Sequence, residues 1–284
     1  VRGNAAQALG EMGASVASYG PDLVPLLKDK ENYVRNFASK TLRIFGKSSA
    51  TYAPDLISLL KDKDEKVRQS AAFLLKEMGK LAVPYAPDLI PLLEKGESMD
   101  IRLTAAEVLG KMGELSAPHA LELIPLLKKD EKWNIRLTAT QVLGEMGELA
   151  ASHASKLIPL LKKDESSEIR KAAVNALGKM GELAAPHAAE LIPLLKKGEN
   201  RSIRHAAVAA LGKMGELPAD YAPSLIPLLK ELNFSHSGAT VLKNMGGSVA
   251  DHASLLISLL KDKDVNAQRK AVEVFGKWGA SDAS

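Results

Sequence analysis

The chain has 284 residues, of which 46% are hydrophobic and 25% are charged, and this composition excludes a disordered protein. It contains no cysteine, which excludes disulfides, thiol nucleophiles and thiolate metal ligands. The 38 basic and 34 acidic residues leave a net charge of +4, a weak signal for nucleic-acid binding in a chain of this length.

Two short strings recur along the whole chain, usually every 33 or 34 residues: Leu-Leu-Lys or a near relative, and a glycine that follows methionine or its equivalent. This period predicts one array over residues 1–284. The array is a half unit, 1–13, followed by eight two-helix units that end near residues 46, 79, 113, 147, 181, 215, 246 and 279. Within each unit the apolar positions recur at three and four residues, which predicts two helices. We call these helices A and B.

The chain opens inside a B helix, VRGNAAQALG, with no A helix before it. A half unit cannot bury its own apolar face. We therefore expect the chain to be part of a larger protein.

The A helices carry an unusual proline. In PDLIPLL, Pro87 starts the helix, where its missing N–H is not needed, but Pro91 lies one turn inside. The same position holds Pro25, Pro125, Pro159, Pro193 and Pro227, with serine at Ser58 and Ser258. The sequence predicts a bend in most A helices.

A typical B helix is IRKAAVNALGKMG, residues 169–181. Ile169, Ala173, Leu177 and Met180 fall on one face and are expected to be buried. Gly181 suits the left-handed residue that ends a helix, and the interior glycine, Gly178 here, predicts a close approach between helices.

The string LISLLKDKDEKVRQSAAFLL resembles HEAT repeats of the short bacterial type, similar to the PBS-lyase-type HEAT-like repeats, and the resemblance covers essentially the whole chain. It implies an all-α, right-handed α-solenoid of stacked antiparallel helix pairs. It also implies a ladder of contacts between neighbouring units, in which the arginine of helix B meets the turn aspartate. The matching residues are Asp29, Asp62, Asp130, Asp164 and Asp262, and Arg2, Arg35, Arg68, Arg102, Arg136, Arg170 and Arg204.

Some units depart from this pattern. Gly96 and Gly198 replace the aspartate, and Ser235 and Gln268 replace the arginine. The seventh unit has also lost three residues from its inner turn, so we expect an irregular stack near Phe234.

One column just before helix A alternates between histidine and tyrosine: His119, His153, His187 and His252, with Tyr19, Tyr52, Tyr85 and Tyr221. Stacked helices lie about 8–10 Å apart, too far for two imidazoles to share one zinc. We expect a packing and hydrogen-bonding role and no metal site. No nucleophile motif or phosphate-binding loop is found, so we expect no catalytic residue and no cofactor.

Counted from the Val or Ile that precedes the arginine, positions 2, 6 and 10 of helix B point away from the buried face, toward the concave side of a HEAT array. In three neighbouring units these positions and position −2 are rich in apolar residues. An exposed apolar cluster with a tryptophan is a usual anchor for a partner. The predicted partner-binding residues are Phe73, Met99, Leu103, Glu107, Trp133, Leu137, Gln141, Lys171 and His205. The alternative is that Met99 and Trp133 fold back over the next unit and are buried.

The sequence therefore predicts a non-enzymatic scaffold that binds a protein or peptide on its concave face, with nucleic acid disfavoured and no small-molecule substrate. An amphipathic peptide with acidic residues at one end fits best, because Lys171, Lys179, Lys213 and Arg269 make the later units basic. The alternatives are a nucleic-acid-binding HEAT-like protein and a HEAT-like enzyme such as a bilin lyase.

No run reaches the roughly 18 apolar residues of a membrane span, and no cationic segment followed by an apolar core stands at the start. We expect a cytoplasmic protein that does not enter the membrane.

Overall fold

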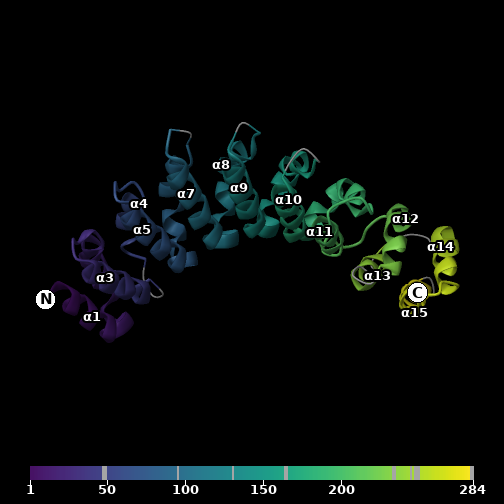
Figure 1. The fold of residues 1–284 in the computed structure, drawn as a ribbon, viewed down its shortest axis with the longest axis horizontal. Coiled ribbons are helices and arrows are strands. Elements are labelled where there is room, and N and C mark those ends of the chain that lie inside the picture. Colours follow the sequence, from purple (N-terminus) through teal and green to yellow (C-terminus); the bar gives the residue numbers. More distant parts are fainter. Residues whose placement is uncertain are drawn as a thin grey trace. The chain divides into compact units, whose positions relative to one another are not determined.

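A computed structural model describes residues 1–46, 50–94, 96–129, 131–162, 166–231, 235–243, 245 and 250–281. These residues form α-helices and 3-10 helices (Figure 1), and their one β-type pairing is an isolated bridge between Leu217 and Met245. The chain divides into two compact units, Val1–Met146 and Gly147–Ser284.

In the first unit, five B helices pack in sequence, each against the next. They are α1 (Arg2–Met12), α3 (Asn32–Phe45), α5 (Glu65–Met78), α7 (Met99–Met112) and α9 (Trp133–Glu145). The A segments between them are η1 (Gly13–Tyr19), α2 (Gly20–Leu23) and η2 (Val24–Lys28); α4 (Ala53–Leu59); η3 (Gly79–Tyr85), α6 (Ala86–Leu89) and η4 (Ile90–Leu93); and η5 (Gly113–His119), α8 (Ala120–Leu123) and η6 (Ile124–Leu127).

The second unit repeats this arrangement. Its B helices are α10 (Ser167–Lys179), α11 (Arg201–Leu211), α13 (Ser235–Lys243) and α15 (Val265–Ser281), again each packed on the next. Its A segments are η7 (Gly147–Lys156) and η8 (Ile158–Leu161); η9 (Gly181–Glu190) and η10 (Ile192–Leu195); η11 (Ala219–Tyr221), α12 (Ala222–Leu225) and η12 (Ile226–Lys230); and α14 (Ala250–Leu260).

The apolar spacing of the B helices places one face of each in the core. Ile169, Ala173, Leu177 and Met180 of α10 are all fully buried, which confirms the prediction for this helix. Stacking of such faces removes apolar surface from water and is the main force that holds the repeats together.

The proline of helix A decides which kind of helix forms. Where Pro91 stands, the α-helix α6 ends at Leu89 and a 3-10 segment, η4, takes over. Where Ser58 stands instead, α4 remains α-helical from Ala53 to Leu59. Proline has no N–H to donate to the carbonyl four residues earlier, so the chain tightens into the 3-10 form. Where the sequence predicted a bend, the structure shows this change of helix type.

Most described glycines that end B helices have positive φ, but Gly46, at the end of α3, has φ −61°. Gly181 has φ 60°, as predicted. At Gly113, however, φ is 63° and ψ is −140°, outside the left-handed helical region, which has ψ near +45°. Residues with a side chain hardly enter this conformation, so the requirement for glycine is stricter there than the sequence suggested.

The interior glycines are explained only in part by close packing. A Cβ on Gly110 would lie 2.9 Å from Val142 Cγ2, and one on Gly178 would lie 2.8 Å from Ala210 Cα. Close approach is therefore confirmed at these two positions. It is wrong for Gly212, where a Cβ would meet Val241 Cγ2 at an ordinary 3.6 Å.

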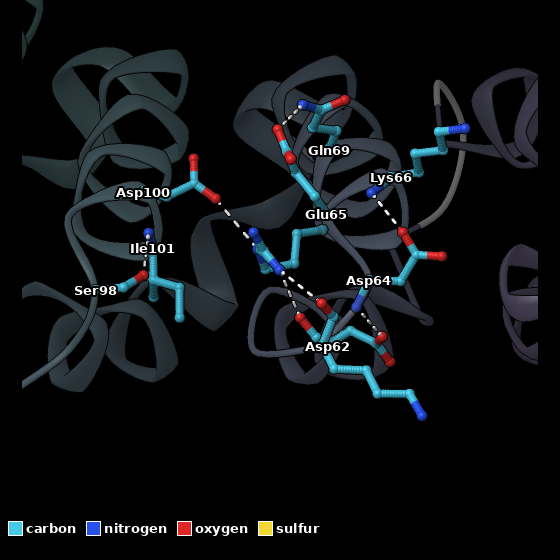
Figure 2. A network of polar contacts seen from close by, with 10 residues as sticks. Asp62, Asp64, Glu65, Lys66, Gln69, Ser98, Asp100 and Ile101 are labelled. Carbon is cyan, nitrogen blue, oxygen red and sulfur yellow. Dashed lines mark hydrogen bonds and ion pairs between the residues drawn. The ribbon is translucent and has the colours of Figure 1, made fainter.

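Local hydrogen bonds close the turn between helices A and B (Figure 2). Asp62 Oδ1 accepts the Asp64 N–H at 2.9 Å, and Asp64 caps α5 by accepting the Lys66 N–H at 2.9 Å. Arg68 donates from Nη1 to the backbone carbonyls of Asp62, at 2.9 Å, and Lys63, at 3.3 Å. The arginine thus fixes its own turn before it contacts a neighbour.

The ladder between units differs from the prediction. Arg2 does bind the turn aspartate of the next unit, with Nε 2.6 Å from Asp29 Oδ2. Arg68 instead contacts Asp100, in the first turn of α7, at 3.2 Å (Figure 2). The implied arginine–aspartate ladder is correct for the first pair and wrong for the second.

Arginines later in the chain pair with a glutamate in the turn between helices A and B of the next repeat. Arg102 is buried, donates from Nε to the Leu93 carbonyl at 2.9 Å, and forms a bidentate pair with buried Glu131 at 3.0 Å on both oxygens. The same pattern joins Arg170 to Glu199 and Arg204 to Glu231. Glutamate reaches these guanidinium groups because its side chain is one methylene longer than that of aspartate. The Arg204 guanidinium holds the pKa of Glu231 below its ordinary value.

Two turn aspartates pair with lysines instead. Lys28 Nζ lies 2.5 Å from Asp62 Oδ2, and Lys230 Nζ lies 2.7 Å from Asp262 Oδ2. Each lysine ends the A helix of the preceding repeat and lowers the pKa of its aspartate by hydrogen bonding. These two lysines therefore hold neighbouring repeats together.

Gln268, where most units have arginine, donates to the Asp262 carbonyl at 2.7 Å and so keeps the local half of the arginine contacts. Asp130, Asp164 and the predicted irregularity at Phe234 lie outside the described residues.

Candidate functional site

The outward face of α5, α7 and α9 carries an apolar patch, which we define as Phe73, Met99, Leu103, Trp133 and Leu137. The exposed fractions of Trp133, Phe73 and Met99 are 58%, 44% and 37%. Leu103 and Leu137 are half-buried. All five residues lie in the first compact unit, on B helices that contact one another in turn. The alternative, in which Met99 and Trp133 are buried against the next repeat, is wrong.

The helix starts position the two largest members of the patch. Met99 is the first residue of α7, which Ser98 caps by accepting the Ile101 N–H at 3.4 Å. Trp133 is the first residue of α9. At the first turn a side chain has no preceding helical turn beneath it to pack against. The indole and the thioether are therefore held at the edge of the stack with much of their surface in water.

A weak polar contact ties the two helix starts together. Asn134 Nδ2 lies 3.4 Å from Met99 Sδ, within the range of a hydrogen bond to sulfur. The asparagine follows Trp133 directly, so this contact fixes Met99 beside the start of α9. Nothing in the sequence pattern signalled it.

The two predicted polar residues of this face are exposed. Glu107 Oε2 accepts a hydrogen bond from Lys76 Nζ at 2.8 Å, which joins α7 to α5. Gln141 lies on α9, one turn beyond Leu137. Such an exposed ion pair contributes about 0–1 kcal/mol, so Glu107 borders the patch without stabilising the fold strongly.

The remaining predicted residues lie in the second unit, on α10 and α11, which pack together. Lys171 is exposed and His205 is half-buried. Their face is basic where that of the first unit is apolar. Arg201, which the prediction missed, starts α11 at the position that Met99 and Trp133 occupy in their helices, and it is exposed. Counting from Ile203 to position −2 would have found it.

The prediction also missed a set of exposed leucines between helix B and the next helix A. Each follows the helix-ending glycine by two residues: Leu81, Leu115, Leu149 and Leu183, with exposed fractions of 43%, 50%, 64% and 62%. Three of them end a Gly-Glu-Leu string and the fourth ends Gly-Lys-Leu, but this string is not a sufficient signal, because Leu217 ends the same Gly-Glu-Leu string and is buried.

The histidine and tyrosine column behaves as predicted at one described position. Tyr52 is fully buried, and its hydroxyl donates to the Leu42 carbonyl at 2.5 Å. Burial raises the pKa of this hydroxyl. Tyr85, His119, His153 and His187 are half-buried, and Tyr19 is exposed. Across the described ranges, no group of three or more histidine or acidic side chains is placed to hold a metal ion.

Within the same ranges, every helix is too short or too polar to cross a membrane.

The repeat geometry can be compared with known proteins. The family model described as HEAT repeats matches residues 1–76, 53–122, 120–192 and 156–235. The chain belongs to the HEAT-repeat family. This confirms the fold expected from the sequence, an α-solenoid of stacked helix pairs.

One solved structure that resembles this HEAT-repeat chain is the crystal structure of an engineered protein, at 17% sequence identity and a TM-score of 0.51. The match covers 81% of this chain and 98% of the engineered one, and at this identity it bears on the fold alone. No curated protein sequence matches the chain.

Proposed function

We propose that this HEAT-repeat chain is a non-enzymatic cytoplasmic scaffold that binds a protein or peptide on the outward face of its B helices. The observation that carries the proposal is the exposure of Trp133, at 58%, beside Met99 and Phe73. HEAT repeats are general scaffolds for protein interaction.

The patch has the composition of a binding hot spot. Tryptophan supplies a large apolar surface with few rotatable bonds, and it dominates the binding energy of many interfaces. Leu103 and Leu137 are half-buried, each four residues after Met99 or Trp133 on the same helix. The Lys76–Glu107 pair supplies a polar border. This arrangement fits the apolar side of an amphipathic peptide.

The patch adds little to the stability of the free chain. Trp133, Phe73 and Met99 keep 37–58% of their surface in water, so each contributes only part of the roughly 1.5–3 kcal/mol gained by full burial. Exposed apolar clusters mark interaction sites more often than they stabilise a monomer.

A selection from a random peptide library against the full chain tests this proposal. Selected peptides are synthesised and titrated against the unaltered chain and against Trp133→Ala/Leu137→Ala. We expect the double variant to weaken binding at least about 30-fold, the equivalent of about 2 kcal/mol. The Trp278→Phe substitution leaves Trp133 as the only tryptophan of the chain. In this background, bound peptide should shift the fluorescence emission of Trp133 to the blue and protect it from a neutral quencher.

The matched control is Leu81→Ala/Leu115→Ala, which truncates two exposed leucines of the same unit outside the patch. It should leave affinity within about 3-fold. Failure to select any peptide, or an equal loss in both double variants, would refute binding at the patch.

A further inference from the structure

The outward face of α10 and α11 is basic. Positions −2, 2, 6 and 10 hold Ser167, Lys171, Asn175 and Lys179 on α10, and Arg201, His205, Ala209 and Lys213 on and just after α11. None of these eight residues is acidic or a large aromatic. We call Lys171, Lys179, Arg201, His205 and Lys213 the basic face.

Three of these cations are uncompensated. Within the part of the chain that the structure describes, Lys171, Arg201 and Lys213 are exposed and form no ion pair. Lys179 and His205, in contrast, interact with other residues.

Two carboxylates in the neighbouring turns are already occupied. Glu199 and Glu231 pair with the buried arginines Arg170 and Arg204 and so do not neutralise the basic face. Glu216, three residues after Lys213, is exposed and forms no ion pair with it among the described residues.

Helix stability does not account for Arg201. A cation in the first turn of a helix opposes the helix dipole, and the equivalent first turns of α5 and α7 carry acidic residues, Glu65 and Asp100. The first turn of α11 has no acidic residue, and Arg201 is its first residue. A side chain that is exposed, unpaired and unfavourable for its own helix is best explained by a ligand of opposite charge.

The spacing favours separate carboxylates over a phosphate chain. Arg201 and Lys213 are twelve residues apart, about 18 Å along the helix axis. Lys171 lies on the neighbouring helix, about 8–10 Å away, one helical turn beyond the position equivalent to Arg201. Nucleic-acid surfaces combine a continuous basic track with aromatic stacking, and the basic face has neither. An extended peptide covers about 18 Å in five or six residues.

We propose that the basic face binds an acidic segment of a partner protein, with one carboxylate group between Lys171 and Arg201 and a second at Lys213. The two acidic groups of the segment are separated by about five residues. This inference rests on the proposed function, because it gives the peptide-binding scaffold a second contact surface and names its chemistry.

Fluorescence anisotropy of a labelled peptide tests the proposal. The probe has two Asp-Glu pairs separated by five uncharged residues, and a shuffled probe has the pairs adjacent. In low salt, we expect the full chain to prefer the spaced probe. We expect Arg201→Glu/Lys213→Glu to weaken binding at least about 30-fold, since each reversal replaces an attraction with a repulsion.

Arg201→Glu places an acidic residue in the first turn of α11, so by itself it should leave the melting temperature unchanged or raise it. Lost binding in the Arg201→Glu single variant and in the double variant would then reflect the surface and not unfolding. The matched control, Lys162→Glu/Lys196→Glu, makes the same charge change on exposed lysines just after the A segments of the same unit and should alter affinity less than about 3-fold.

Absence of binding by the unaltered chain, or an equal loss in the control, would overturn the inference. Tighter binding of a single-stranded oligonucleotide through Arg201 and Lys213 would also overturn it, in favour of nucleic acid. Trp133→Ala/Leu137→Ala, titrated in parallel, separates the two proposals. If the selected peptides need Trp133 but the acidic probe does not bind, only this inference fails; if neither probe binds, the peptide-binding function fails as well.

Discussion

Arginines at one position of the repeat make different contacts, and their surroundings decide how much each contributes. The side chains of Arg102 and Glu131 are 7% and 5% exposed and meet in a bidentate pair. The side chains of Arg68 and Asp100 are 23% and 59% exposed and meet through one contact of 3.2 Å. Removing one partner of a buried pair leaves an uncompensated charge, whereas water replaces the partner of an exposed one.

Glu131→Gln is therefore expected to lower the free energy of unfolding by about 3 kcal/mol, because Arg102 keeps its charge without a counterion. Asp100→Asn makes the equivalent change at the exposed pair and should cost less than about 1 kcal/mol. Urea denaturation followed by circular dichroism measures both. Similar losses in the two variants would show that burial does not set the strength of these pairs.

At the scale of the element, a single residue of helix A selects between two helix types. Pro91 is the second residue of the 3-10 segment η4, whereas Ser58 leaves the α-helix α4 intact. Ser58 also returns a hydrogen bond from its hydroxyl to the Asp55 carbonyl at 2.7 Å. The flanking leucines are buried in both cases, so packing accommodates either form.

Pro91→Ser is expected to extend α6 through Leu93, because the restored N–H can donate to the Pro87 carbonyl. Ser58→Pro should have the reverse effect and end the α-helical part of α4 near Leu56. Backbone carbon chemical shifts from NMR distinguish the two forms at Leu92 and Leu93. An unchanged 3-10 pattern in Pro91→Ser would mean that tertiary packing, and not proline, sets the helix type.

At the scale of the molecule, contacts gather within two compact units, Val1–Met146 and Gly147–Ser284. In a solenoid each repeat is stabilised by its neighbours, so a local loss of stability spreads to adjacent repeats and fades with distance along the chain. The apolar patch and the basic face fall in different units. Each surface therefore depends mainly on the stability of its own unit.

Amide hydrogen exchange by mass spectrometry tests this independence. Glu131→Gln should speed exchange in α7 and α9, which the lost pair supports, and leave α11 close to the rate of the unaltered chain. The matched variant in the second unit is Glu231→Gln, which should speed exchange in α11 and leave α7 unchanged. Equal acceleration everywhere in either variant would show that the chain unfolds as one cooperative body.

The sequence by itself determined the repeat, the solenoid fold and the buried face of the B helices, because periodic burial and helix-ending glycines depend on local spacing. It also selected the patch residues, since position −2 and position 2 lie on one helical face. The exposure of Trp133 was not decided by spacing, because an indole at a helix start can lie over the next repeat or in water.

Tertiary structure alone decided the pairing between repeats. The arginine column suggested one aspartate ladder, yet Arg68 meets Asp100 and Arg102 meets Glu131. Which carboxylate reaches a guanidinium depends on side-chain length and on the offset between stacked helices, and neither is written in the sequence of one repeat.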